Sequence, residues 1–157
     1  MDYEIINTAS EWEREGEKLA LAIVVKTWGS SPRQPGSMML IREDGHIVGS
    51  VSGGCVEGAV IVGSKKILQE NHAELMHFGV ADEDAWSVGL SCGGQISVFV
   101  CPLSKIEPNL FQKALKATES RLSVEIECDL KQGTVSTLEN KLNSEDNFFR
   151  MQIIPKP

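Results

Sequence analysis

At 157 residues, with 41% hydrophobic and 24% charged residues, the chain has the size and composition of one globular domain with its own core. A formal net charge of -7 leaves no basic stripe for the phosphates of a nucleic acid and argues against that class of partner. No apolar run reaches membrane-spanning length and the first four residues are acidic rather than signal-like. We therefore expect a cytoplasmic protein that does not bind a membrane, with residues 1–157 as one domain.

The first third of the chain predicts a helix, a buried strand and a hairpin. A capping residue at position 8 or 10 favours an amphipathic helix that runs to Leu19. The short β-branched run 21–25 is typical of a strand buried on both faces. Residues 37–42 and 46–51 predict the two strands of a hairpin, and the Asp44-Gly45 pair predicts a tight turn between them.

The middle of the chain predicts one helix and two strands. Residues 56–69 form the clearest helical pattern, and we interpret Gly58 and Gly63 as places where this helix packs closely on a sheet. Strands are predicted over 74–78 and over 95–101, where Pro102 stops the second strand. Between them, the acidic residues 82–84 favour the cap of a short helical turn.

The last third predicts one helix and three strands. Proline near its start favours a helix over 108–118, and residues 121–128 alternate like a strand. A turn is predicted over 131–133, with further strands over 135–138 and 148–154. The fold class expected from all these elements is α/β, a mixed β-sheet with flanking helices.

The chain has four cysteines, too few for a disulfide scaffold, and we expect them to be reduced. They are Cys55, Cys92, Cys101 and Cys128. No Cys-x-x-Cys or His-x-x-x-His spacing supports a zinc site. Cys101 and Cys128 fall in strand-like segments, which predicts core or half-buried fillers. The three histidines, His46, His72 and His77, are scattered and predicted to be ordinary surface or half-buried residues.

The other two cysteines are each flanked by two glycines, in the segments 52–57 and 91–94. Cys55 lies between a predicted strand and a predicted helix start, where unpaired N–H groups favour an anion and also the thiolate form of a cysteine. Glycines allow φ > 0 and let a ligand approach the backbone. Cys92 leads directly into the strand 95–101. The pattern indicates a binding or reaction site assembled from two loops, although inert packing remains an alternative for both thiols.

Three segments of the chain form a linked set of motifs. The first is the run 26–39, Lys-Thr-Trp-Gly-Ser-Ser-Pro-Arg-Gln-Pro-Gly-Ser-Met-Met. The second is 49–57, Gly-Ser-Val-Ser-Gly-Gly-Cys-Val-Glu. The third combines Phe78-Gly79-Val80, Asp84-Ala85-Trp86 and the run 89–94. In their order and spacing across residues 21–103, these motifs resemble the XdhC/CoxI family, the accessory proteins of xanthine dehydrogenase and aerobic carbon monoxide dehydrogenase.

The resemblance implies an accessory protein, a chaperone rather than a turnover enzyme. Family members are thought to bind the molybdenum cofactor, protect it during sulfuration by a cysteine desulfurase, and deliver it to a molybdenum hydroxylase apo-enzyme. The expected partners are therefore that apo-enzyme, a cysteine desulfurase and, through a homodimer, a second copy. Many members carry a second, Rossmann-like domain. Residues 104–157 contain no Gly-x-Gly-x-x-Gly, so we expect an extension of uncertain role, and a separate chain to supply the missing half.

The resemblance also implies roles for residues in the three motifs. The cofactor's phosphate would sit on the amides of residues 53–55 with help from Arg33, and polar side chains such as Gln95 would bind the pterin edge. Trp28 and Trp86 would stack on the pterin or merely anchor their loops. The expected cofactor-binding set is Arg33, Gln34, Ser52, Gly53, Gly54, Cys55, Glu57, Cys92, Gly93 and Gly94, with Cys55 and Cys92 also as molybdenum ligands.

Other interpretations stay open. Glu57 would either give a proton or a hydrogen bond to the ligand, or simply stabilise the first helical turn by about 0.3–1 kcal/mol. Cys55 would alternatively serve a thiol-dependent enzyme or sulfur carrier, although no histidine lies in a motif loop as its base. In a regulatory or scaffold subunit, the glycine loops would contact only another protein.

Overall fold

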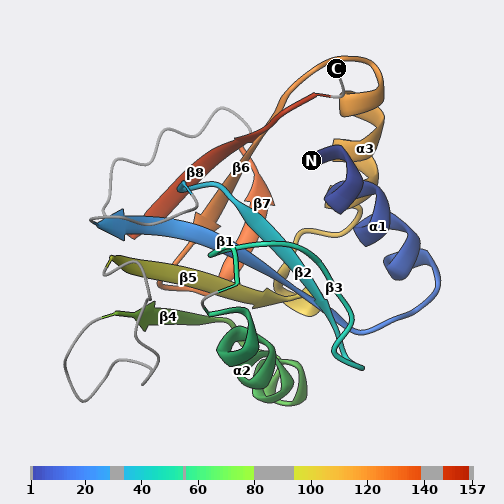
Figure 1. The fold of residues 1–157 in the computed structure, drawn as a ribbon. Coiled ribbons are helices and arrows are strands. Elements are labelled where there is room, and N and C mark those ends of the chain that lie inside the picture. The colour runs from blue at the N-terminus through green and yellow to red at the C-terminus, as the bar shows by residue number, and fades with distance from the viewer. Residues whose placement is uncertain (1, 29–33, 55, 80–93, 139–146, 156–157) are drawn as a thin grey trace.

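A computed structural model describes residues 2–28, 34–54, 56–79, 94–138 and 147–155, and these form two β-sheets with three α-helices (Figure 1). The helices are α1 (Asp2–Arg14), α2 (Glu57–Glu70) and α3 (Leu110–Glu119), and a 3₁₀ turn spans Leu103–Lys105. The strands are β1 (Leu19–Trp28), β2 (Met38–Arg42), β3 (Ile47–Gly49), β4 (Glu74–Phe78), β5 (Gln95–Pro102), β6 (Val124–Asp129), β7 (Thr134–Thr137) and β8 (Phe148–Ile153).

The strands divide between a five-stranded sheet of order β3-β2-β1-β5-β4 and a three-stranded sheet of order β7-β6-β8. The expected α/β class, with helices flanking a sheet, is confirmed. The strands form two sheets rather than one mixed sheet, and every pair of neighbouring named strands is antiparallel. The α2 crossover does join two strands that run in the same direction. These strands, β3 and β4, lie at opposite edges of the sheet and do not pair.

The apolar run in β1 is buried because both faces of the central strand are covered. Leu19, Leu21 and Ile23 pack into a core with α1, α3 and the three-stranded sheet. Ala20, Ala22 and Val24 pack into a second core that includes residues of α2. Figure 1 shows α2 on one side of the large sheet and the other two helices, with β6–β8, on the opposite side. The predicted buried strand over 21–25 is confirmed.

The first helix differs most from its prediction. It starts at Asp2 and ends at Arg14, whereas we expected a helix from residue 8 or 10 to 19. Its buried side chains include Ile5, Ala9 and Trp12, spaced at four and three residues along one stripe. The helix must end before residue 19, because Leu19 already pairs in β1. The other helices, the hairpin and the strands appear where they were predicted, within a few residues.

Two local expectations in the middle of the chain have different outcomes. Gly63 is buried on α2, but Gly58 is exposed, and a Cβ at that position would meet nothing within 4 Å. Close packing therefore does not explain Gly58. The predicted helical turn at 82–86 lies outside the described residues. Within the described part of the chain, no helix is long and apolar enough to cross a bilayer.

Candidate functional site

The segments that carry the three motifs all start from the same end of the five-stranded sheet (Figure 1). Strands β1, β3 and β4 end there, at Trp28, Gly49 and Phe78, and strands β2 and β5 begin there, at Met38 and Gln95. The register pairs Trp28 with Gln95 and Met39 with Gly49 across neighbouring strands. Antiparallel pairing thus brings together three segments that are far apart in the sequence.

The second motif forms a loop held by the carboxylate of Glu57, at the start of α2. Oε2 of Glu57 accepts hydrogen bonds from Ser50 Oγ at 2.7 Å, from Val51 N–H at 3.1 Å and from Ser52 N–H at 3.0 Å. Oε1 accepts from Gly54 N–H at 3.0 Å and from the Ser52 hydroxyl. One side chain therefore collects five donors from the described residues of the loop that precedes its own helix.

The two serines extend this network. Ser50 Oγ accepts a hydrogen bond from Gly53 N–H at 2.8 Å, and Ser52 Oγ accepts one from Val56 N–H at 2.9 Å. The N–H groups of Gly53 and Gly54, which we expected to hold a phosphate, thus already have partners inside the loop. A phosphate at these two groups would have to displace Ser50 and Glu57.

The network also fixes the charge of Glu57. Burial raises the pKa of this carboxyl, but hydrogen bonds from Ser52 and Ser50 outweigh burial and bring the pKa down to about 2. At neutral pH Glu57 is a carboxylate and has no proton to give. Its observed role is to stabilise the loop ahead of the helix, which modifies the interpretation that it stabilises the first helical turn.

The glycines of the loop leave its outer side open. Gly53 and Gly54 are exposed and adopt φ of 73° and 119°, a region that side chains rarely occupy. A Cβ on Gly54 would meet nothing within 4 Å, so a flat ligand can approach the backbone there. At the third motif, a Cβ on Gly79 would collide with the carbonyl of Gly94, which shows how closely the two ends of that segment approach.

The remaining predicted site residues are only partly placed. Gln34 is exposed ahead of β2, Ser52 is buried in the Glu57 network, and Gly94 is buried beside β5. The following lie outside the described residues: Arg33, Cys55, Trp86, Cys92 and Gly93.

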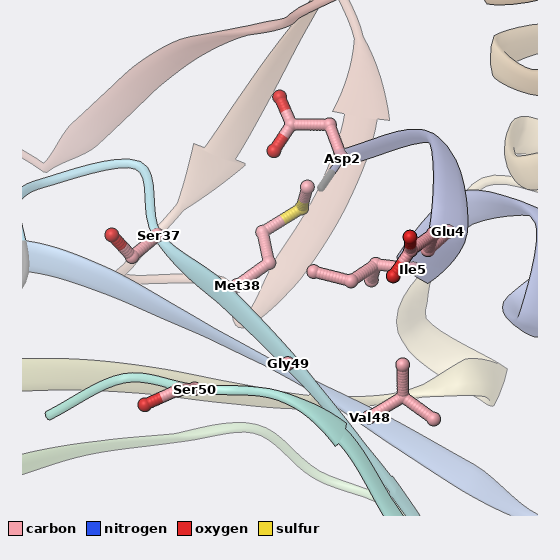
Figure 2. Close-up of a pocket in the computed structure, with 8 residues that line it drawn as sticks. All are labelled: Asp2, Glu4, Ile5, Ser37, Met38, Val48, Gly49 and Ser50. Carbon is pink, nitrogen blue, oxygen red and sulfur yellow. The ribbon is translucent and has the colours of Figure 1, made fainter. Parts of the chain in front are cut away.

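A cavity of about 280 Å³ lies beside these loops, and it was not predicted. Its lining joins the ends of β2 and β3 to the start of α1: Asp2, Glu4, Ile5, Ser37, Met38, Val48, Gly49 and Ser50. Figure 2 shows Met38 and Ile5 directed into the space between β2 and α1, with Asp2 near the Met38 side chain. A second cavity of about 410 Å³ shares Asp2 and Ser37 and extends toward β8.

Two of the four cysteines are unsuited to chemistry at neutral pH. Cys101 and Cys128 are free and fully buried, which confirms that they fill the core. Burial raises the pKa of Cys101 to about 12, and burial raises that of Cys128 even further. Only Cys55 and Cys92 remain as candidate thiolates. Among the residues that the structure describes, no group of three or more His, Cys, Asp or Glu side chains could hold a metal ion.

Residues 12–79 match the model of the XdhC and CoxI family, a span that contains the first two motifs and the start of the third. The chain is 42% identical to "Uncharacterized protein YqeB" of Escherichia coli (strain K12) over 96 residues, which are 61% of this chain and 18% of that protein. It is 30% identical to "Molybdenum cofactor insertion chaperone PaoD" of the same strain over 126 residues, 80% of this chain and 38% of that protein.

The fold resembles a crystal structure titled as a xanthine dehydrogenase from Bacillus halodurans, with a TM-score of 0.75 and 25% sequence identity. The match covers 99% of this chain and 53% of that chain. The chain therefore spans about half of this structure and less than two fifths of either E. coli relative. Residues 12–79 of this chain are therefore similar to the XdhC and CoxI family.

Proposed function

We propose that this chain is an accessory protein that binds the molybdenum cofactor and assists its sulfuration and its insertion into a xanthine dehydrogenase-type molybdenum hydroxylase. The observation that carries the proposal is the meeting of the family's motif segments at one end of the five-stranded sheet. The names of the relatives support it, since one is called a molybdenum cofactor insertion chaperone and another a xanthine dehydrogenase.

The role of the second motif is to offer a loop that is already ordered before the cargo binds. Glu57 and the two serines fix the backbone around Gly53 and Gly54 through hydrogen bonds within the loop. Since the loop does not need to be ordered on binding, less conformational entropy is lost when the cargo arrives. The open face above Gly54 suits a flat pterin.

The thiols of Cys55 and Cys92 supply the contact to the metal in this proposal. Molybdenum is thiophilic, and a thiolate binds a soft metal better than an oxygen ligand does. Because Cys101 and Cys128 are buried with raised pKa values, these two motif cysteines are the thiols left for that task. Gln34 would contact the pterin, together with Arg33, Gly93 and Gly94 from the neighbouring segments, while Ser52 and Glu57 hold the loop that faces the ligand.

Partners and location belong to the same proposal. The cargo would be received with a cysteine desulfurase and passed to the apo-hydroxylase in the cytoplasm, with this chain acting as a homodimer. Because the relatives are longer, residues beyond the matched span, on this chain or on another, would complete the handling of the cofactor.

The test is an anaerobic titration of the protein with molybdenum cofactor, beside Cys55→Ala and Cys92→Ala. We expect saturable, near-stoichiometric binding that weakens in both variants. Cys128→Ala is the matched control, because it removes a buried thiol that lies away from the motif segments. Absence of binding to the wild type would overturn the proposal, and binding unchanged in both motif variants would remove the thiols from it.

A second candidate, a thiol enzyme or sulfur carrier that uses Cys55, is favoured by the position of this residue two positions before α2. A helix start lowers the pKa of a nearby thiol. The alkylation rate of Cys55 against pH distinguishes the two ideas. An unperturbed thiol pKa near 8.5 counts against an activated nucleophile.

A further inference from the structure

One polar row interrupts the apolar surface of the five-stranded sheet near the end where the motif segments start. On β5, Ile96 and Val98 face the α2 core, whereas Phe99 and Cys101 face the opposite core, so Ser97 faces the side of α1 and α3. The register pairs Ser97 with His77 on β4 and with Lys26 on β1. The next row on this face, Leu75, Phe99 and Ile23, is entirely apolar.

Ser97 positions the imidazole ring of His77. Its hydroxyl lies 2.7 Å from Nδ1 of His77, and the serine is only 2% exposed. This is the one hydrogen bond that the Ser97 side chain makes within the described residues. When the hydroxyl donates to Nδ1, the proton of the neutral ring sits on Nε2 and points away from Ser97. His77 is half-buried, and its Nε2 has no hydrogen-bond partner in the described part of the chain.

A β-bulge brings Lys26 into the same row. The register of β1 against β5 shifts between Val24 and Lys26, so that Lys26 lies opposite Ser97. Without the bulge, Val25 would pair with Ser97. Lys26 would then pair with Ile96 and face the α2 core. Bulges re-aim side chains in this way beside binding sites. Here the bulge places an exposed lysine two residues before the end of the strand.

These three side chains offer an ammonium group, an imidazole N–H and a buried hydroxyl that fixes the ring, which is the chemistry that binds a phosphate. The chain as a whole carries a net charge of -7, so this row of donors contrasts with the overall negative charge. The glycine-loop amides that we first assigned to the phosphate are occupied by Ser50 and Glu57. We propose that His77 and Lys26, with Ser97 as a positioning residue, form the subsite for the phosphate monoester of the cargo.

The identity of the cargo rests on the proposed function, but the subsite can be tested with inorganic phosphate in place of the cofactor. Inorganic phosphate is added to the protein at constant pH and ionic strength while the imidazole signals are followed by NMR. We expect a saturable shift of His77, whereas His46 and His72 act as internal controls that do not respond. Sulfate and chloride at matched ionic strength separate specific binding from a general salt effect.

The variants separate contact from positioning. Lys26→Gln changes an exposed side chain and should raise the dissociation constant for phosphate by about fivefold to tenfold, the usual weight of one charge-assisted contact. Ser97→Ala keeps His77 but removes the hydroxyl beside its Nδ1. We expect the nitrogen chemical shifts of His77 to report a mixture of the two neutral tautomers instead of one. A His77 signal that does not move with phosphate, or that moves as much as His72, overturns the subsite.

Titration with the phosphate-bearing molybdenum cofactor keeps the two proposals apart. His77→Gln should weaken this binding by about tenfold if the phosphate sits on the row. If the cofactor binds to the wild type while His77 ignores phosphate, the subsite is overturned and the proposed function stands. If His77 responds to phosphate while the cofactor fails to bind, the anion subsite stands and the proposed function is overturned.

Discussion

The short strand β3 has a carboxylate-held turn at each end, and the two turns are stabilised in different ways. At residues 42–46, Asp44 accepts two hydrogen bonds from Arg42, at 2.8 and 3.0 Å, and one from the N–H of His46. At residues 50–57, the described donors to Glu57 are hydroxyl and backbone N–H groups. Both carboxyls have a pKa of about 2.

The same pKa therefore arises from two physical causes. For Asp44, the hydrogen bond from the Arg42 guanidinium lowers the pKa of an exposed carboxyl. For Glu57, burial raises the pKa, and hydrogen bonds from uncharged donors lower it by more than burial raises it. Salt screens the first arrangement, and exposed pairs of this kind contribute little to stability. The Glu57 network is not an ion pair, and it orders a longer segment than the Asp44 turn does. Such order is expected where a loop must be fixed before a ligand binds.

Substituting Gly45, which precedes β3, and Gly49, the last residue of β3, should produce the largest difference in stability. Gly45 and Gly49 both have φ near 90°, but a Cβ on Gly45 meets open space, whereas one on Gly49 would collide with the Met38 carbonyl. We expect Gly49→Ala to lower the free energy of unfolding by about 3 kcal/mol or more, and Gly45→Ala by about 1–2 kcal/mol. Urea unfolding measures both. Equal losses would mean that the backbone beside Gly49 adjusts without cost.

Glu57→Gln should have the next largest effect. An amide replaces one oxygen with a donor that faces either the N–H of Gly54 or those of Val51 and Ser52, so at least one backbone N–H group loses its partner. We expect a loss of about 1–3 kcal/mol in the free energy of unfolding, together with weaker binding of the molybdenum cofactor. A variant as stable as the wild type would show that the network does not order the loop.

The pH dependence of this loss follows from the direction of the pKa shift. The pKa of Glu57 falls from 4.5 to about 2 on folding, so the unfolded chain binds the proton more readily between these values. The stability that Glu57 supplies is therefore present above pH 4.5 and disappears as the pH falls toward about 2. Unfolding of the wild type and Glu57→Gln should converge over this window, and a gap that persists at pH 2 would contradict the assignment.

Asp44→Asn should have the smallest effect, and salt should identify it. Because Asp44 and Arg42 are both accessible to solvent, we expect a small loss of stability at low ionic strength that vanishes at high salt. The loss in Glu57→Gln should persist in the same high-salt buffer. Salt sensitivity in both variants would remove the distinction between the two turns.

Local sequence signals predicted most of the elements around the site. The Asp44-Gly45 pair marked the hairpin turn, and the strand over 74–78 and the helix from residue 56 appeared within a residue of their predicted bounds. The start of α1 was wrong because a capping residue in its middle, at position 8 or 10, was taken as its beginning. The stripe that includes Ile5 and Ala9 was the stronger signal.

The hydrogen-bond network of Glu57 and the polar row of Lys26, Ser97 and His77 could not be predicted from the sequence. Glu57 was noted at a helix start, but nothing in the chain indicates that it folds back to collect donors from Ser50 through Gly54. His77 was interpreted as an ordinary histidine, since its partner Ser97 is twenty residues away on another strand. The bulge that places Lys26 beside them depends on the register of β1 against β5.

The sequence by itself determined the family motifs, the central buried strand, the hairpin and the helix after the second motif, because turns, caps and hydrophobic periodicity act between near neighbours. The tertiary structure decided that two antiparallel sheets form, that three motif segments meet at one end, and that the loop amides bind Glu57. Those features depend on strand order and register, which are set when distant apolar faces are buried together, as on the two sides of β1.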